Sequence, residues 1–343
     1  MSDAGDLDLD VADLDVADLD VVGIGNALVD ILSHEDDGFV DRHGLTRGSM
    51  ALIDSERAEE LYSAMGPGTE VSGGSAGNTM AGIASFGGRA AYIGRVFDDQ
   101  LGGVFGHDLR ATGVVFRSRQ AISGPPTGRS LIVITSNGER TMNTYLGAAA
   151  LLGPDDLDPE LIAAAQVTYL EGYLWDRPEA KEAYRVATEI AHEHGKVTAL
   201  TLSDSFCVQR HRLEWRELID TSVDIVFANE DEITMLYETT TFREALEEVR
   251  THCQIACLTR GPTGSVIVTA KDEYVIDAHP VARVIDTTGA GDMYAAGFLF
   301  GYTHGYDLPA AGRMASLAAA EALSHIGARP ESPFRQLLDQ LEV

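Results

Sequence analysis

The chain has 343 residues, of which 45% are hydrophobic, and it carries a formal net charge of −29. This length and apolar content suit one α/β domain with an insertion. The acidity argues against a nucleic-acid partner, because such partners need a basic face. No apolar run reaches membrane-spanning length, the N-terminus is acidic, and three cysteines make no disulfide framework, so we expect a cytoplasmic protein without a membrane partner.

The first predicted segment, residues 1–18, is an acidic repeat. Leucine or valine alternates with aspartate, and eight aspartates lie between Asp3 and Asp20. Mutual repulsion opposes pairing of this pattern as a strand, so we expect a disordered, solubilising tail, with an acidic interaction arm as the alternative. The remaining residues, 19–343, are expected to form one domain.

The next segment, residues 21–25, is predicted to be a buried strand. Its two glycines suggest a dinucleotide fingerprint, but Leu28 stands where the third glycine belongs, so we reject dinucleotide binding. No G-x-x-x-x-G-K-[ST] sequence occurs, which excludes a P-loop kinase. Asn26 and Asp30 follow the strand, and their amide and carboxylate suit the two hydroxyls of a diol. A helix cap or a salt bridge is the alternative for Asp30.

Strands and helices alternate along most of the chain, which favours a mainly parallel sheet with helices on both faces. The strand-like runs are residues 90–93, 131–135, 167–170, 197–202, 225–228, 256–259 and 265–269. The helical stretches are residues 77–86, 178–194, 243–251 and 308–325. Two ranges, 34–53 and 114–146, interrupt the alternation, and an Asn-Gly pair at 137–138 predicts a hairpin in the second.

Residues 284–301 carry the strongest functional signal. A short apolar run is followed by the turn Gly289-Ala290-Gly291, which opens a helix. The unpaired backbone N–H groups of such a turn, together with the helix dipole, form an anion site. Asp292 lies at its mouth and suits a base that takes a proton from a hydroxyl while the N–H groups hold the phosphoryl group. An ordinary N-cap is the alternative.

Three segments together resemble the signatures of the ribokinase-like (PfkB) family of sugar and nucleoside kinases. They are D-T-T-G-A-G-D-x-x-x-x-G-F at residues 286–298, G-G-S-A-G-N at residues 73–78, and N-x-x-E at residues 229–232. They occur in the family's order, and the resemblance runs from about residue 21 to the C-terminus. It implies a ribokinase-like α/β fold, with a mainly parallel central sheet and a small β-rich lid of residues 34–53 and 114–146. Closure of that lid over the acceptor would exclude water.

The resemblance also implies ATP and Mg²⁺ as cofactors, with K⁺ as a further candidate. Asn229 and Glu232 would organise Mg²⁺, through water, near the ATP phosphates; a solvated acidic helix start is the alternative. Residues 259–264 match the family's ATP-binding loop, although a plain turn would also explain them. The nucleotide-side candidates are Asn229, Glu232, Thr259, Arg260, Gly261, Gly264 and Thr288.

Within that family, the spellings G-N-x-L-x-D, S-G-G-S-x-x-N, P-T-G and E-R-T-M-N-T-Y-L-G-A resemble adenosine kinases. This implies an apolar slot for a base, on which Tyr173 would stack, while Arg140 would reach from the lid toward the phosphates. Core packing is the alternative for Tyr173. The chain departs from adenosine kinases at Ala27, Ala76 and Gly77, which bear on the base pocket. The acceptor-side candidates are Asn26, Leu28, Asp30, Gly73, Gly74, Asn78, Arg140, Met142, Leu146 and Tyr173.

We therefore expect an ATP-dependent kinase, a monomer or homodimer, that phosphorylates the 5′-hydroxyl of a nucleoside, adenosine first. Asp292 would be the base, and Gly289, Ala290 and Gly291 would hold the transferring phosphate. The first alternative is a sugar kinase of the same family, acting on ribose, fructose or a keto-deoxy sugar acid. The second is a non-catalytic nucleotide-binding regulator, against which the presence of Asp292 and Glu232 argues.

Overall fold

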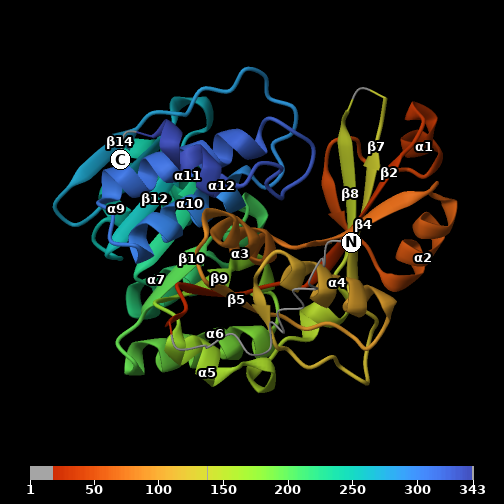
Figure 1. The fold of residues 1–343 in the computed structure, drawn as a ribbon, viewed down its shortest axis with the longest axis horizontal. Helices are drawn as coiled ribbons and strands as arrows, with labels where there is room; N and C mark the ends of the chain where they lie inside the picture. Colours follow the sequence, from red (N-terminus) through yellow and green to blue (C-terminus); the bar gives the residue numbers. More distant parts are fainter. Residues whose placement is uncertain (1–17, 137, 342–343) are drawn as a thin grey trace, which may run out of the picture.

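The computed structural model describes residues 18–136 and 138–341, and a large sheet forms its centre (Figure 1). In this described part, nine strands run in the order β14-β13-β12-β11-β10-β9-β1-β5-β6. They are β1 (Val21–Ile24), β5 (Ala90–Ile93), β6 (Val115–Phe116), β9 (Val167–Glu171), β10 (Val197–Thr201), β11 (Ile225–Asn229), β12 (Ile255–Thr259), β13 (Ser265–Val268) and β14 (Glu273–Ile276). Pairing is parallel from β6 to β12 and antiparallel at β13 and β14, which confirms the predicted mainly parallel sheet.

Helices cover both faces of this sheet, because the parallel strands alternate their apolar side chains between two cores. In β1, Val21 points into one core and Val22 into the other. The first core includes side chains of α3 (Ser75–Phe86), α4 (Gln100–Ala111), α10 (Ala290–Thr303) and α11 (Leu308–Ala322). The second includes side chains of α5 (Pro159–Ala164), α6 (Pro178–Glu193), α7 (Ser205–Ser222), α8 (Glu230–Tyr237) and α9 (Phe242–Val249).

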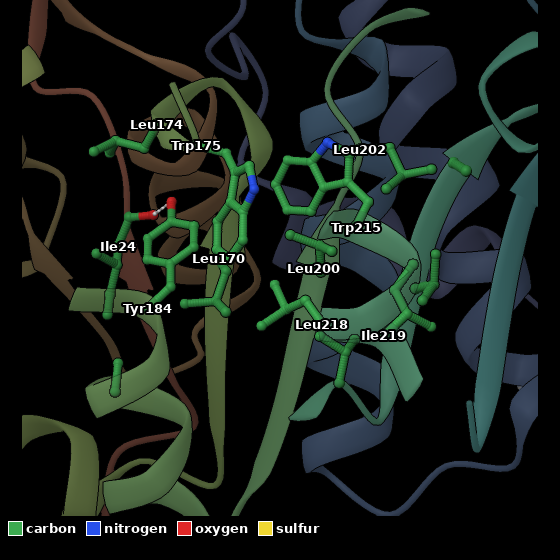
Figure 2. Packing of buried hydrophobic residues seen from close by; sticks show 14 of the residues in the cluster. Ile24, Leu170, Leu174, Trp175, Tyr184, Leu200, Leu202, Trp215, Leu218 and Ile219 are labelled. Atoms are coloured by element: carbon green, nitrogen blue, oxygen red, sulfur yellow. Dashed lines mark hydrogen bonds between the residues drawn. The ribbon is translucent and has the colours of Figure 1, made fainter. Parts of the chain in front are cut away.

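The second core is anchored by aromatic side chains that follow β9 and lie on α6 and α7 (Figure 2). The rings of Trp175 and Trp215 stack with centroids 4.6 Å apart, and Tyr184 packs against Trp175 at 5.8 Å. The phenol of Tyr184 also donates to the carbonyl oxygen of Glu171 at 2.5 Å. This packing fixes the C-terminal ends of β9 and β10, where polar residues follow.

A second, five-stranded sheet stands beside the first, and we call it, with α1 (Asp37–Arg42) and α2 (Ser55–Ala64), the small sheet unit (Figure 1). Its order is β3-β8-β7-β2-β4. The strands are β2 (Leu28–His34), β3 (Met50–Leu52), β4 (Gly68–Gly73), β7 (Gly128–Ile134) and β8 (Arg140–Tyr145). The predicted hairpin forms, since β7 and β8 pair antiparallel on either side of residue 137.

The small sheet unit is larger than the two interrupting ranges suggested. Strands β2 and β4 lie outside ranges 34–53 and 114–146, apart from the last residue of β2, and β6, from the second range, pairs with β5 in the large sheet. Only residues 25–27 separate β1 from β2, so the chain leaves one sheet and enters the other at once.

The described ends of the chain contribute one short helix to the fold. A short helix, α12 (Phe334–Leu337), packs Phe334 against Phe86 of α3. The tail predicted for residues 1–18 lies, apart from Asp18, outside the described residues. Within the described part, no helix is both long and apolar enough to cross a membrane.

Candidate functional site

A cleft of about 800 Å³ lies along the C-terminal ends of the parallel strands, between the two sheets. Because parallel strands end at a common edge, Glu171, Thr201 and Asn229 reach it from β9, β10 and β11 although they are far apart in sequence. Most of the predicted site residues meet here. Those that line the cleft are Asn26, Leu28, Asp30, Gly74, Asn78, Met142, Leu146, Tyr173, Asn229, Glu232, Thr259, Thr288, Gly289, Gly291 and Asp292.

Asp292 lies in the first turn of α10, and two donors from α3 hold its carboxylate. The Ser75 hydroxyl donates to Oδ1 at 2.6 Å, and the Asn78 amide donates to Oδ2 at 3.0 Å. Burial raises the pKa of Asp292 to about 6, although these two hydrogen bonds and the Arg329 charge oppose the rise. The group can therefore exchange a proton near neutral pH.

The turn before Asp292 has the backbone of an anion site. Gly289 has φ +78°, in the left-handed region, and a Cβ there would lie 2.5 Å from the Cβ of Ala328. Nothing lies within 4 Å of the place where a Cβ of Gly291 would be, so the backbone is open to the cleft. The N–H of Ala290 donates to Thr287 O at 3.4 Å, so it already has an acceptor, and Ala290 does not line the cleft. Helix geometry leaves the N–H groups of this first turn without intrahelical acceptors.

Glu171 is a buried carboxylate of the cleft that the sequence analysis did not identify. Its Oε1 accepts from the amide of Asn26 at 2.8 Å, and its Oε2 accepts from the backbone N–H of Ala76 at 2.8 Å. Burial raises the pKa of Glu171 to about 7, while these hydrogen bonds lower it. Glu171 thus ties the segment after β1 to the beginning of α3.

Asp30 faces the cleft from β2, close to β4. Burial raises the pKa of Asp30 to about 6, against the opposing charges of Arg140 and Arg329. Gly73 does not line the cleft, but a Cβ there would lie 2.5 Å from the Asp30 carboxylate, so glycine makes room for that side chain. At Gly74, φ is +87° and a Cβ would lie 2.1 Å from the carbonyl oxygen of Asn26.

Arg140, which does not line the cleft, reaches from β8 to the segment between β14 and α10, where it forms an ion pair with Asp286. Both side chains are 7% exposed. Asp286 also accepts from the N–H of Thr288 at 3.0 Å and from the N–H of Gly327 at 3.0 Å. Burial alone would raise the pKa of Asp286, but these donors and Arg140 hold it below its usual value. Arg140 therefore joins the small sheet unit to the segment that leads into the Gly289 turn.

Apolar side chains also line the cleft. Leu28 and Met142 line it from the small sheet unit, Leu146 directly follows β8 of that unit, and Tyr173 follows β9 of the large sheet. The phenol of Tyr173 donates to Ser203 O at 3.2 Å, which fixes the ring. Three further apolar residues of the lining are unusually exposed: Met50 at 41%, Leu52 at 55% and Phe206 at 71%.

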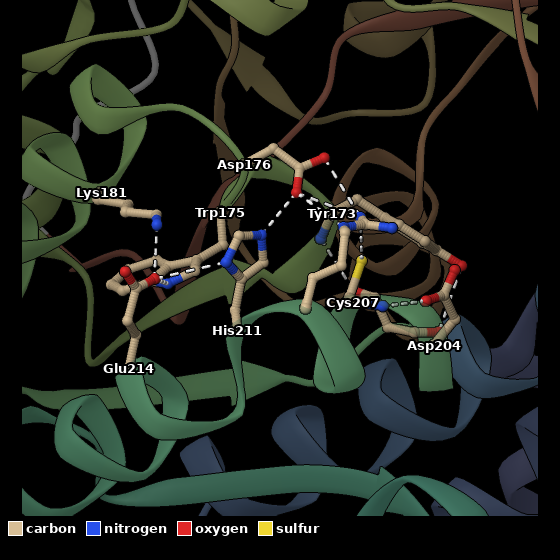
Figure 3. A network of polar contacts seen from close by, with 10 residues as sticks. Tyr173, Trp175, Asp176, Lys181, Asp204, Cys207, His211 and Glu214 are labelled. Carbon is tan, nitrogen blue, oxygen red and sulfur yellow. Dashed lines mark hydrogen bonds and ion pairs between the residues drawn. The ribbon is translucent and has the colours of Figure 1, made fainter.

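Phe206 is carried by the first turns of α7, which a polar network holds in place (Figure 3). Asp204 caps the helix by accepting from the N–H of Cys207 at 2.7 Å. Asp176 accepts from Arg210 at 3.2 Å and contacts a ring nitrogen of His211 at 2.6 Å. At His211 the backbone leaves helical geometry, so residues 205–210 form a short helical segment of their own.

Asn229 and Glu232 form a reciprocal capping box at the start of α8. The Asn229 amide donates to Glu232 Oε1 at 2.6 Å, and the Glu232 N–H donates to Asn229 Oδ1 at 2.8 Å. Burial raises the pKa of Glu232 to about 7. Among residues 18–136 and 138–341, no group of three or more His, Cys, Asp or Glu side chains could hold a metal ion. Glu232 offers one carboxylate, which suits an ion that keeps most of its ligands as water and phosphate.

The predicted nucleotide loop lies mostly outside the cleft lining. Thr259 lines the cleft, whereas Arg260, Gly261 and Gly264 do not. Arg260 donates to Glu230 at 3.0 Å and lies 4.4 Å from the ring centroid of Phe242.

Several residues of the cleft were missed by sequence reasoning, for different reasons. Glu171 ends an apolar run, and a charged residue at that place is a usable signal. Phe206 lies outside every motif, and nothing in the sequence marks it. Arg329, also outside every motif, does not line the cleft but donates to Asn78, which does. Lining residues that were not predicted include Met50, Leu52, Ser75, Glu171, Asp176, Thr201, Ser203, Asp204, Phe206, Cys207 and Arg210.

The chain is similar to known kinases in both sequence and fold. Residues 48–335 match the model of the pfkB family of carbohydrate kinases. The crystal structure of adenosine kinase from Sinorhizobium meliloti is 52% identical, covers 94% of this chain and 99% of its own, and superposes with a TM-score of 0.88. A probable sugar kinase from Rhizobium etli CFN 42 is 49% identical over 94% of this chain and 98% of its own, also with a TM-score of 0.88. A 5-dehydro-2-deoxygluconokinase of Geobacillus thermodenitrificans is 27% identical over 80% of this chain and 84% of its own.

Proposed function

The chain belongs to the pfkB family of carbohydrate kinases, and we propose that it transfers a phosphoryl group from ATP to the 5′-hydroxyl of a nucleoside, adenosine first. Its relatives are phosphotransferases that act on hydroxyl groups. The observation that carries the nucleoside proposal is the group of apolar side chains in the cleft that also contains Asp30: Leu28, Met142, Tyr173 and Phe206. A free sugar has no flat apolar part to fill such a space.

In the proposed mechanism, Asp292 takes the proton of the attacking hydroxyl. Ser75 and Asn78 each donate to one of its oxygens, so the carboxylate is oriented before the acceptor arrives. The N–H groups after Gly289 would hold the transferring phosphoryl group, and closure of the small sheet unit would exclude water. Mg²⁺, held through water at Glu232, would supply neutralisation of the phosphate charge.

The sugar-acid alternative is disfavoured by the charges of the cleft. Within the described lining, Arg210 is the one cationic side chain, and it already pairs with Asp176. A carboxylate substrate would need an available cation to offset the loss of its hydration. A neutral acceptor avoids this cost.

A panel assay tests the proposal directly. ATP consumption would be measured with adenosine, guanosine, inosine, ribose, fructose and 5-dehydro-2-deoxygluconate, each with the wild type and with Asp292→Asn as the inactive control. We expect the highest kcat/KM with a nucleoside. Faster turnover of any free sugar or sugar acid would contradict the nucleoside proposal and favour the sugar-kinase alternative, in which the same catalytic residues act.

A further inference from the structure

Arg329 follows α11 in the chain and lies partly buried between α3 and the end of β4. Its Nε donates to Oδ1 of Asn78 at 2.9 Å. Its Nη2 donates to the carbonyl oxygen of Ser72 at 2.9 Å and to the Ser72 hydroxyl at 3.1 Å. One guanidinium thus joins a residue of α3 to a residue of the small sheet unit.

The first consequence is the orientation of the Asn78 amide. An amide can present either its oxygen or its NH₂ group to a neighbour, and the partners decide which. A guanidinium can only donate, so Arg329 occupies the oxygen of Asn78 and turns the NH₂ group the other way. That NH₂ group is the one that donates to Asp292 Oδ2 at 3.0 Å. Without Arg329, the Asn78 oxygen loses this donor, and Asp292 alone holds the amide.

The second consequence is the attachment of β4. The N–H of Ser72 donates to Asp108 of α4 at 3.0 Å, while its carbonyl and hydroxyl oxygens accept from Arg329. Charge-assisted hydrogen bonds of this kind are about twice as strong as neutral ones. Ser72 is therefore held both by α4 and by the loop between α11 and α12, one residue before the chain turns into α3 through Gly73 and Gly74.

The third consequence is electrostatic. Ser75 and Asn78 of α3 hydrogen-bond to Asp292. The groups that interact with its charge are Tyr169 and Glu171 of β9, Asp30 of β2, Tyr173 and Arg329. Arg329 is the one cation in this described set. Burial lowers the pKa of Arg329, and the carboxylates of Asp30, Asp108 and Asp292 oppose that change. Its charge favours the ionised form of Asp292, the form that can accept a proton.

We propose that Arg329 is a positioning residue for phosphoryl transfer, which orients Asn78 toward Asp292 and anchors β4 beside the acceptor site. The inference rests on the proposed role of Asp292 as the base. Arg329 lies outside the three sequence motifs, so the segment after α11 would also contribute to the arrangement of the catalytic residues.

The first experiment replaces Arg329 with methionine, which keeps most of the side chain's length and removes its charge and donors. Loss of hydrogen bonds to charged groups should lower kcat about 10- to 100-fold while leaving the KM for ATP within about twofold. Arg335→Met, at an exposed position of the same segment, is the matched control and should leave kcat unchanged. If Arg329→Met does not fold, Arg329→Gln, which retains one donor, is measured in its place.

The second experiment separates positioning from plain stabilisation. Because the positive charge favours ionised Asp292, its removal should move the acidic limb of the kcat–pH profile to higher pH, whereas Arg329→Lys should keep the limb and recover part of kcat. Asn78→Ala should reduce the effect of Arg329→Met, since the two changes then act on one contact. An unshifted limb, with rate losses that follow only the melting temperature, would overturn the proposal.

A readout without turnover keeps this inference separate from the proposed function. The Asp292 carboxyl can be titrated by ¹³C NMR in the wild type and in Arg329→Met, and we expect a higher pKa in the variant. Full activity of Asp292→Asn would defeat the proposed mechanism. An unchanged carboxyl titration and an unchanged kcat in Arg329→Met, while Asp292→Asn is inactive, would defeat only the role of Arg329.

Discussion

At the scale of single residues, the cleft brings together carboxylates whose surroundings differ from ordinary surface positions. Asp30 and Asp292 have a pKa of about 6, and Glu171 and Glu232 a pKa of about 7, in each case because burial disfavours the charged form. Each also has a different set of partners, so their proposed tasks can be separated by substitution.

Asp292→Asn should lower kcat roughly 10²–10⁴-fold, the range expected for a lost general base, with little change in the KM values. Asparagine keeps the shape but cannot take the proton. Asp307→Asn is a suitable control, because Asp307 caps the neighbouring α11 and asparagine also caps helices.

In the wild type, kcat/KM should fall as pH drops below about 6, because Asp292 is then protonated. Stopped-flow or coupled assays across pH 5–8 would measure this, and a flat acidic limb would contradict it.

Asp30→Ala should raise the KM of the acceptor about tenfold or more and leave the KM of ATP nearly unchanged. The reason is that lost hydrogen bonds to a charged group cost about 1.5–3 kcal/mol each. Asp37→Ala, at an exposed carboxylate of α1 in the same small sheet unit, is the control. 2′-Deoxyadenosine should be a poorer substrate than adenosine for the wild type. Its kcat/KM should fall less than that of adenosine when Asp30 is replaced by alanine. Equal effects on both KM values would remove Asp30 from the acceptor site.

At the scale of elements, α7 contains a natural pair for comparison. Phe206 and Leu213 are similarly exposed, at 71% and 74%, but only Phe206 lines the cleft. The break in the helix at His211 lies between them. The same helix therefore offers a substitution at the proposed base slot and a matched one outside it.

Phe206→Ala should raise the KM of a nucleoside roughly fivefold or more, because contact between an aromatic ring and a base contributes about 1–3 kcal/mol. Leu213→Ala should leave that KM unchanged. Any residual turnover of free ribose should respond to neither change, since ribose lacks a base. Steady-state kinetics on the two variants would measure this, and an equal response of nucleoside and ribose would place the base elsewhere.

The elements also show where prediction from sequence succeeded and where it stopped. The alternation of apolar runs predicted the large sheet, and the helices near 77–86, 178–194, 243–251 and 308–325 all formed, with each end within three residues of its predicted place. The small sheet unit was incomplete in the prediction because β2 follows β1 after three residues and reads as its continuation. Arg329 could not be predicted, because its partners Ser72 and Asn78 are about 250 residues away in the chain.

At the scale of the whole molecule, the dominant fact is excess negative charge, at −29 for the full chain. Like charges repel each other more in the compact state than in the unfolded chain. The buried carboxylates of the cleft add to this effect, because their ionised forms are disfavoured in the fold.

We therefore expect the melting temperature to rise as pH falls from 8 to about 5.5. Where the pKa of a carboxyl is higher in the folded than in the unfolded protein, the fold binds the proton more tightly, so stability is lost as pH rises from about 4 through about 7. One pKa unit corresponds to about 1.4 kcal/mol. Asp30→Asn removes one such group and should weaken the dependence, which scanning calorimetry across this range would measure. A melting temperature that falls over the same interval would show that other groups dominate.

Residues 25–27, where the chain passes from the large sheet to the small sheet unit, have a consequence for the rate of the reaction. Asn26 lies within this segment and Asp30 is the third residue of β2, so an acceptor that contacts both side chains spans the joint between the two sheets. In the proposed closed state, the acceptor can leave only when that joint opens. The time that the acceptor stays bound then equals the lifetime of the closed state. Solvent viscosity slows large rotations, so raising it should slow turnover even though it has no effect on the transferred phosphate.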